Sequence, residues 1–368
     1  MIELVSPLSG KPLHRDSAHS LSDGTSERWP VIDDIPYLRV GSEELAARLL
    51  AHLDRGESSA ALVLLLAEND RWWNEPPPPP AQLRDLVDRR GTLTLREAMA
   101  LLGWGRVGDY FAHRWSDPTY VAGLALLDAH WTAPATAFEL ACGIGHYLRA
   151  LCQVGVRAIG ADLVFAKLWV ARHWVAPEAE LVCFDAEQPW PVRLRTDLAL
   201  CHDAFYFLGN KPHVAAQLLE AAATVALAHV HNSQHPNLST GEGMTRLEVE
   251  DLFPDATLYA DEELTACGAS GRLPEPFHGD KTEAFGIAIG PPASEPGPLG
   301  MPLSGASLTR NPLCIGGAPA WPSERYADEY GGRVTYACRA DLPDRTLMAP
   351  EWIDAVRRRE LVDLPERW

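Results

Sequence analysis

The sequence predicts an α/β protein built on a mostly parallel sheet with helices on both faces. Strand-like and helix-like segments alternate through residues 136–290, which is the pattern of a parallel sheet covered by helices. The segment Thr136–His146 (TAFELACGIGH) reads as a strand, a tight turn of small residues and the start of a helix. Several of the expected strands end in an acidic residue, and ligands of such sheets bind at the carboxyl ends of strands.

The core of this fold is expected at residues 131–290. Residues 291–368 form a C-terminal extension, in which residues 291–312 are rich in Pro, Gly and Ser and predict a long loop. The rest of the extension is expected to be a short tail with one helix at Ala349–Glu360. The expected strands of the core are Thr136–Ala141, Val156–Asp162, Leu181–Phe184, Asp197–His202, Val225–His231, one near Ala256–Tyr259, and Ala284–Ile289.

Residues 41–130 are expected to form a helical lead-in to the core. Leucines recur at helical spacing over residues 42–73 and again over 81–130. The five prolines Pro76–Pro80 lie between these regions and favour a stiff, extended linker. A ligand for a proline-binding module is the alternative interpretation of this run. The end of the lead-in, Asp109–Trp131, is rich in aromatic residues.

Residues 1–40 are expected to form a small β-rich module. The pieces SPLSGKPL (Ser6–Leu13) and WPVIDDIPYLR (Trp29–Arg39) flank a turn-rich middle. This arrangement resembles the zinc-ribbon module of the Trm112 type. Hydroxyl side chains replace the thiolates that zinc requires, so we expect a degenerate ribbon without a metal. The four positions concerned are Ser6, Ser9, Ser22 and Thr25.

The charge of the chain argues against long nucleic acids as partners. The formal net charge is −18, and nucleic-acid affinity depends on Lys and Arg that displace counterions from phosphates. The sequence has no run of about 20 apolar residues, so it predicts no membrane span. The first 30 residues are polar and rich in Pro and Ser, unlike a signal peptide. We therefore expect a cytoplasmic protein, and we interpret its seven cysteines as free thiols in a reducing compartment.

The first motif with a chemical meaning is the loop that follows the strand at residue 136. Glu139 ends the apolar run, and Ala141, Gly143 and Gly145 form a small-residue turn that opens a helix. Such a loop lets the backbone approach a nucleotide-like ligand. The next strand ends at Asp162, whose carboxylate is suited to accept two hydrogen bonds from a ribose diol. These two signals alone fit either NAD or S-adenosylmethionine.

A third signal favours S-adenosylmethionine. Asp185 follows the third strand and precedes Ala186, and with the motifs above the region 105–290 resembles the class I S-adenosylmethionine-dependent methyltransferases. The resemblance implies that Glu139 and the loop meet the methionine end of the cofactor and Asp162 its ribose. It further implies that adenine lies against the residues of the second and third strand ends. Tyr110 and Arg114 would cover the cofactor, although Arg114 paired with a protein acid is an equal alternative. The full cofactor set is Tyr110, Arg114, Glu139, Ala141, Gly143, Gly145, Asp162, Leu163, Asp185, Ala186 and His202.

Candidate catalytic residues follow the fourth and fifth strands of the core. His202, Asp203 and Tyr206 come after the fourth strand, and His231 ends the fifth. A base is needed only where the acceptor must lose a proton. The segment HVHNSQH, with His229, could instead bind a metal or simply hydrogen-bond at a strand end. We assign no metal ligand from the sequence.

The sequence therefore predicts a methyltransferase that methylates oxygen or nitrogen of a small molecule and releases S-adenosylhomocysteine. An RNA methyltransferase is the first alternative, because some of these enzymes join a zinc ribbon to the same core. A non-catalytic, cofactor-binding partner subunit is the second. An NAD-dependent oxidoreductase is disfavoured, since the loop lacks the third glycine of the dinucleotide motif. The sequence leaves open whether the protein forms a homodimer.

Overall fold

The structure is a computed structural model that describes residues 3–25, 27–69, 73–236 and 241–368. Residues 70–72, at the end of an expected helical region, and residues 237–240, in the loop after His231, lie outside the described residues. In the described part of the chain, no helix is long and apolar enough to cross a membrane.

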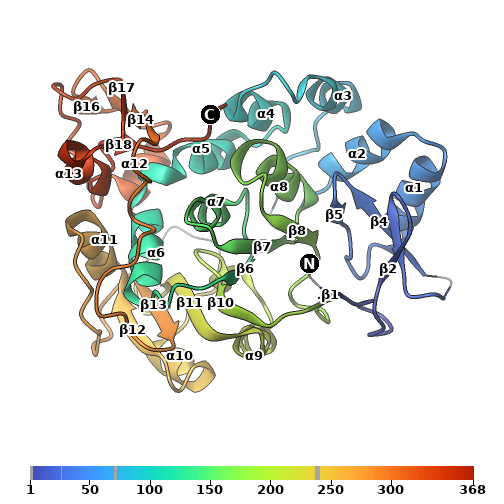
Figure 1. Cartoon of the computed structure of the whole chain (residues 1–368), viewed down its shortest axis with the longest axis horizontal. Coiled ribbons are helices and arrows are strands. Elements are labelled where there is room, and N and C mark those ends of the chain that lie inside the picture. The colour runs from blue at the N-terminus through green and yellow to red at the C-terminus, as the bar shows by residue number, and fades with distance from the viewer. Residues whose placement is uncertain (1–2, 26, 70–72, 237–240) are drawn as a thin grey trace.

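The centre of the molecule is a seven-stranded sheet of order β12-β13-β11-β10-β6-β7-β8 (Figure 1). The only antiparallel pairings within it are those of β13 with β11 and β12. This confirms the mostly parallel sheet, and each expected strand is present within a few residues of its predicted bounds. The strands are β6 (Thr136–Leu140), β7 (Arg157–Asp162), β8 (Glu180–Cys183), β10 (Thr196–Leu200), β11 (Ala222–His231), β12 (Thr257–Ala260) and β13 (Ala284–Ile289).

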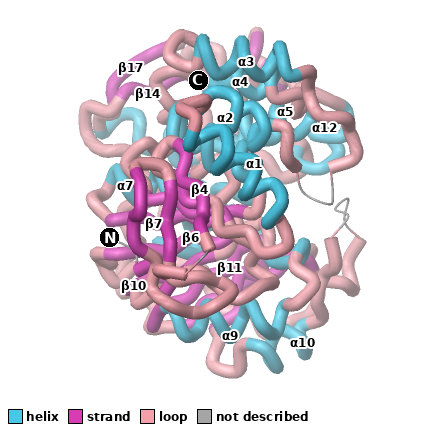
Figure 2. The backbone as a smooth tube through the Cα atoms, turned by 90° about the vertical axis from the view of Figure 1, so that its right-hand side faces the viewer, coloured by secondary structure: helices cyan, strands magenta, loops and turns pink. Residues whose placement is uncertain are grey.

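Helices cover both faces of this sheet. Side chains alternate between the faces along each strand, so Ala137 of β6 packs into one buried cluster and Phe138 into the other. Figure 2 shows α9 and α10 below the strands of the sheet. The first face carries α6 (Pro118–Ala129), α7 (His146–Gln153), α8 (Phe165–Val170), a π-helical turn (Ala171–Val175) and α11 (Asp261–Ser270), and the second carries α9 (Lys211–Ala221) and α10 (Arg246–Leu252).

The N-terminal module is a four-stranded antiparallel sheet that packs beside β8. Leu38 donates its backbone N–H to the carbonyl of Cys183 over 2.8 Å, so the module touches the carboxyl end of a core strand. Hydroxyls stand at the ribbon's expected metal positions, and both Ser9 Oγ and Thr25 Oγ1 donate to Asp23 over 2.6 Å. The strands are β2 (His14–Ser17), β3 (Ser20–Ser22), β4 (Arg28–Ile32) and β5 (Ile35–Pro36), while β1 (Glu3–Leu4) pairs with β9 (Val192–Arg193) of the core.

The lead-in is helical, as expected, and packs over the first face of the core. One of its helices begins in the proline run, with Pro80 in the first turn, where a missing N–H costs nothing. Another is fixed by a capping box between Thr94 and Glu97. The helices are α1 (Glu43–Asp54), α2 (Ser58–Leu66), α3 (Pro80–Arg89), α4 (Leu95–Leu101) and α5 (Gly105–His113), and a 3₁₀ turn (Arg114–Ser116) leads to α6.

The C-terminal extension is more structured than the sequence predicted. β14 (Ser307–Arg310) lies inside the segment expected to be a loop and pairs with β17 (Arg345–Leu347) and β18 (Leu361–Val362). The prediction of a loop was wrong there because four residues flanked by Pro and Gly give no local strand signal, and the partners lie far along the chain. The expected tail helix is a 3₁₀ turn (Pro350–Trp352) followed by α13 (Ile353–Arg357), and β15 (Cys314–Ile315), β16 (Ala318–Pro319) and α12 (Glu324–Tyr330) complete the extension.

Two cysteines of the extension differ from the expectation of free thiols. Cys314 and Cys338 form a disulfide across a separation of 24 residues. The other five are unpaired, and four of those are buried. Cys142, Cys183, Cys201 and Cys267 are buried, and a buried thiol behaves as a small apolar group. The disulfide ties β15 to the segment that follows α12.

Candidate functional site

The first part of the site is the loop between β6 and α7. Glu139 is 3% exposed, and its Oε2 has no hydrogen-bond partner among the described residues. Burial raises the pKa of Glu139 well above its usual 4.5. A buried acidic oxygen without a donor is costly. Its position therefore suits a ligand that brings its own positive donor.

The loop's backbone is held in left-handed conformations. Gly143 and Gly145 have φ of +55° and +85°, and Ala141 has φ of +54°. Glycine adopts this region without strain, whereas alanine is disfavoured there by about 1–2 kcal/mol. The alanine that stands in place of the motif's first glycine is thus strained.

Asp162 ties this loop to the end of β7. Its Oδ2 accepts the N–H of Gly143 over 3.0 Å, and its Oδ1 accepts the N–H of Val164 over 2.9 Å. Each carboxylate oxygen has two lone pairs, so both oxygens keep acceptor capacity. Lys167 Nζ lies 3.9 Å from Oδ1. The side chain is thus fixed at the carboxyl edge of the sheet, where it can accept further hydrogen bonds.

Asp185 and Ala186 lie beyond the end of β8, and Leu163 lies beyond the end of β7. Asp185 is half-buried, and its Oδ1 accepts the N–H of Glu187 over 2.9 Å. Ala186 is buried, and Leu163 is half-buried. The ends of β7 and β8 are neighbours in the sheet, so these residues share one edge with Asp162.

The lead-in covers the loop through α5. A Cβ placed on Gly143 would lie 3.2 Å from the ring of Phe111, so glycine permits this close packing. His146 Nε2 lies 2.9 Å from the carbonyl of Phe111. The helix is thereby held against the loop on the side of the sheet that faces α6 and α7.

A second, polar part of the site surrounds Asp203, which follows β10. Its Oδ2 accepts from the Tyr110 hydroxyl and from Arg114 Nη1, each over 2.8 Å, and its Oδ1 accepts the Tyr206 hydroxyl over 2.7 Å. Burial opposes its ionisation, but the charge of Arg114 lowers the pKa of Asp203 to about 2. Asp203 is therefore an anion that organises its neighbours and a weak proton acceptor.

Arg114 is paired with protein acids, which is the second of the two roles expected for it. Its Nη1 lies 3.3 Å from Asp117 and 2.8 Å from Asp203, and it donates to Thr119 over 2.6 Å. The side chains of Arg114 and Asp117 are 4% and 0% exposed. Arg114 thus holds the lead-in against the end of β10.

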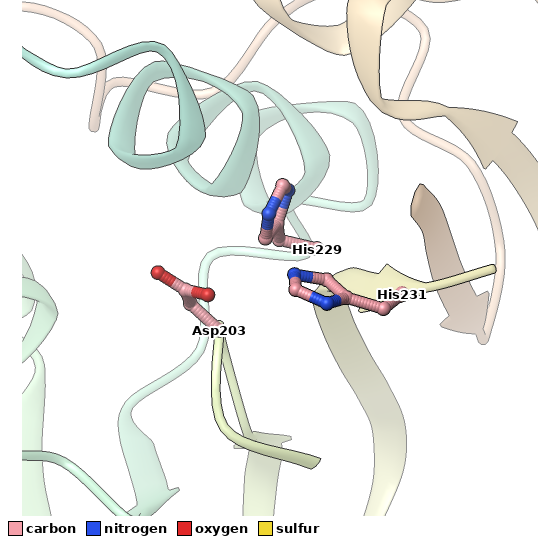
Figure 3. A group of neighbouring side chains, drawn as sticks. All are labelled: Asp203, His229 and His231. Carbon is pink, nitrogen blue, oxygen red and sulfur yellow. The ribbon is translucent and has the colours of Figure 1, made fainter. Parts of the chain in front are cut away.

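Two histidines of β11 complete the polar part. The ring of His231 stacks on Tyr206 with centroids 3.9 Å apart, and the rings of His229 and His231 meet edge to face at 4.8 Å. Figure 3 shows both rings and the Asp203 carboxylate around one shared space. Nδ1 of His229 lies 3.0 Å from Oδ2 of Asp261. Burial lowers the pKa of His229, but the charges of Asp261 and Asp203 outweigh it and raise the pKa to about 9.

His202 lies apart from this group. Its Nδ1 accepts the N–H of Ala228 over 2.9 Å, and burial together with the charge of Arg114 lowers its pKa to about 3. A ring whose lone pair is engaged and whose pKa is low is a poor general base. Its Nε2 therefore carries the proton, and that atom has no partner among the described residues. His202 is therefore better placed to donate a hydrogen bond to a ligand than to act as the base that the sequence suggested.

The sequence interpretation missed Asp261. This residue begins α11 directly after β12, so it carries the same signal, an acid after a strand, that identified Asp162. Its side chain is fully buried, and Arg333 Nη1 lies 3.4 Å from its Oδ2. The C-terminal extension also reaches the polar part, since Tyr110 packs against the cluster that contains Tyr326 and Tyr330 of α12.

Comparisons with known proteins agree with this geometry. Residues 138–225 match the methyltransferase domain family, and the match supports a class I methyltransferase with S-adenosylmethionine as cofactor. No curated protein matches the chain.

Similar solved structures are distant. A TehB-like S-adenosylmethionine-dependent methyltransferase of Corynebacterium glutamicum is 19% identical, with 46% of this chain and 85% of that chain covered and a TM-score of 0.35. An amino pentose methyltransferase of Micromonospora echinaspora is 17% identical, with coverage of 49% and 94% and a TM-score of 0.35. A chain of the complex between the Trm112 methyltransferase activator and a methyltransferase of Haloferax volcanii is 17% identical, with coverage of 54% and 96% and a TM-score of 0.36.

Proposed function

We propose that this protein transfers the methyl group of S-adenosylmethionine to an oxygen or nitrogen of a small-molecule acceptor. The observation that carries the proposal is the buried, unpartnered oxygen of Glu139 beside a loop of left-handed residues. The methionine end of the cofactor presents an ammonium group, which is the positive donor that this oxygen lacks. The acidic side chains after β7 and β8 then suit its ribose and adenine.

The chain's own residues position the two reactants, and they do not have to activate the methyl donor. The cofactor provides a sulfonium-bound methyl group that is already electrophilic. In the overall reaction the bond from sulfur to methyl breaks, a bond from the acceptor atom to methyl forms, and a hydroxyl acceptor releases one proton. The protein's contribution is to align the acceptor and exclude water. We assign the acceptor's place to the polar part of the site, where Asp203, Tyr206 and His231 converge.

A small acceptor is favoured by the surroundings of that place. Aromatic rings from the lead-in and from α12 pack around Tyr110, and small-molecule sites combine such apolar walls with a few polar groups. The net charge of −18 is unfavourable for RNA. The N-terminal module, with hydroxyls at its expected metal positions, packs beside β8 at the edge that we assign to adenine, and the polar part is covered by the lead-in and the extension.

Calorimetric titration with S-adenosylmethionine, S-adenosylhomocysteine and NAD tests the cofactor. The wild type is expected to bind both sulfur ligands, and Asp162→Ala is expected to lose them. Asp197→Ala is the matched control, because Asp197 also caps backbone N–H groups, at 2.9 Å, but at the opposite end of the sheet. Folded wild-type protein that binds neither sulfur ligand would refute the proposal, and binding of NAD would replace it with an oxidoreductase.

Turnover is tested separately by the formation of S-adenosylhomocysteine in the presence of catechols, other phenols, amines or total RNA. Turnover with a phenol or an amine supports the proposal. Turnover with RNA alone would establish the RNA methyltransferase. Binding of the cofactor without turnover by any of these acceptors would favour the non-catalytic partner subunit.

A further inference from the structure

The polar part of the site contains a cluster with the composition of a metal centre. One ligand atom each from Asp203, His229 and His231 lies within 4.8 Å of the others. Both histidines are buried, and the side chain of Asp203 is 7% exposed. Figure 3 shows a carboxylate oxygen of Asp203 and a ring nitrogen of His231 facing the space beside His229.

Each of these three side chains is oriented by a neighbour. Oδ2 of Asp261 lies 3.0 Å from Nδ1 of His229, so the carboxylate faces Nδ1 and Nε2 is the nitrogen that a metal ion could bind in place of a proton. Metal-binding histidines are generally oriented by a carboxylate in this way. His231 is fixed by its stacking on Tyr206, and Asp203 by its bonds to Tyr110 and Arg114.

The backbone is strained at two of the three positions. Asp203 and His229 have backbone φ angles of +52° and +56°, which residues other than glycine seldom adopt. The register of β11 against β13 shifts between Leu227 and Val230, so a bulge re-aims His229 toward the cluster. Strain of this kind persists where a functional arrangement requires it.

The charges around the cluster do not balance. Arg114 pairs with Asp117 and Asp203. Arg333 pairs with Asp261 and Glu283, at 3.4 and 2.9 Å. Two guanidinium groups thus face four carboxylates, three of which have side chains less than 10% exposed. Even with His229 protonated, the four carboxylates outnumber the three cationic groups, so these surroundings favour a bound cation.

We propose that Asp203, His229 and His231 bind one divalent transition-metal ion. Two imidazoles and one carboxylate suit ions of the zinc, cobalt and iron class, whereas Mg²⁺ prefers oxygen ligands. Three protein ligands leave coordination positions open for an oxygen of the acceptor.

The metal-binding claim stands apart from the proposed function, but the role of the metal rests on it. A hydroxyl bound to a divalent ion loses its proton more readily, so the ion would prepare an oxygen acceptor for methylation. Acceptors with two neighbouring oxygens, such as catechols, would occupy two open positions. His231 then acts as a ligand rather than as a base, and the proton of the metal-bound hydroxyl passes to solvent water.

Metal binding is tested on the full chain after removal of metals with a chelator. One equivalent of Co²⁺ or Zn²⁺ is expected to bind, and Co²⁺ is expected to give visible absorption bands of a nitrogen- and oxygen-coordinated ion. His229→Ala and His231→Gln are expected to lose both signals, and Asp261→Asn to weaken binding about 10–100-fold. His235→Ala is the matched control, because His235 is an exposed histidine of the same segment.

Circular dichroism in the presence of chelator establishes that each variant is folded. Folded wild-type protein that binds no Co²⁺ or Zn²⁺ would overturn the proposal, as would unchanged binding by folded His229→Ala and His231→Gln variants. Titration of S-adenosylmethionine into the same preparations separates the two proposals: metal binding without cofactor binding would leave the metal site standing and remove its assigned role.

Discussion

The ion pairs of Arg114 lead to a quantitative prediction about stability. Arg114→Met keeps an apolar chain of similar length and removes the charge that faces Asp117 and Asp203, at 3.3 and 2.8 Å. The three side chains are at most 7% exposed, so water cannot replace the lost partner. Removing one member of a buried ion pair costs about 3–5 kcal/mol. We expect the free energy of unfolding to fall by that amount.

Urea unfolding, followed by tryptophan fluorescence and circular dichroism in the presence of chelator, measures this change. With a denaturant slope of about 3 kcal/mol per M, the midpoint should fall by about 1 M or more. Arg89→Met is the control, since Arg89 and Asp85 pair at 2.8 Å while 53% and 46% exposed, and such a pair contributes about 0–1 kcal/mol. An Arg114→Met variant that unfolds at the same urea concentration as Arg89→Met would refute the reasoning.

Three further predictions concern the loop and the extension. Burial raises the pKa of Glu139, so its carboxyl carries a proton below that raised pKa, and binding of an ammonium group should release this proton. Calorimetry in buffers of different ionisation enthalpy should detect the release in the wild type and not in Glu139→Gln. Ala141→Gly should raise the free energy of unfolding by about 0.5–1 kcal/mol by relieving the left-handed alanine, and a lower urea midpoint would contradict the strain. Replacing both Cys314 and Cys338 by Ser should destabilise the extension by about 3 kcal/mol, as expected for a loop of 24 residues, and reductant should lower the melting temperature of the wild type but leave that of the variant unchanged.

The core could be predicted from the sequence because its signals are local. Each strand is a short apolar run buried on both faces, and the acids at 139, 162 and 185 follow directly from those runs. The partners of β14 could not be predicted, since pairing across the extension depends on residues far apart in the chain. The disulfide was missed for the same reason.

The polar part of the site could be predicted only in outline. Strand alternation places His229 and His231 on one face, but the bulge and the positive φ of His229 depend on how β11 meets β13. The contact of Asp261 with His229 joins two elements that are consecutive neither in the chain nor in the sheet. Burial decides the pKa of His202, and burial is a property of the packed molecule.

The interlocking of the chain's two ends with the core limits how this molecule can be divided. Arg193 of the core pairs with Glu3 at 2.7 Å, and Arg149 pairs with Asp363 at 2.9 Å. Arg367 donates to the carbonyl of His173 over 2.6 Å. The segment that matches the methyltransferase domain is therefore not expected to fold as an independent domain. A fragment limited to this segment would lose these ion pairs and this hydrogen bond. Engineering for a new acceptor must therefore redesign the flanking regions together with the core.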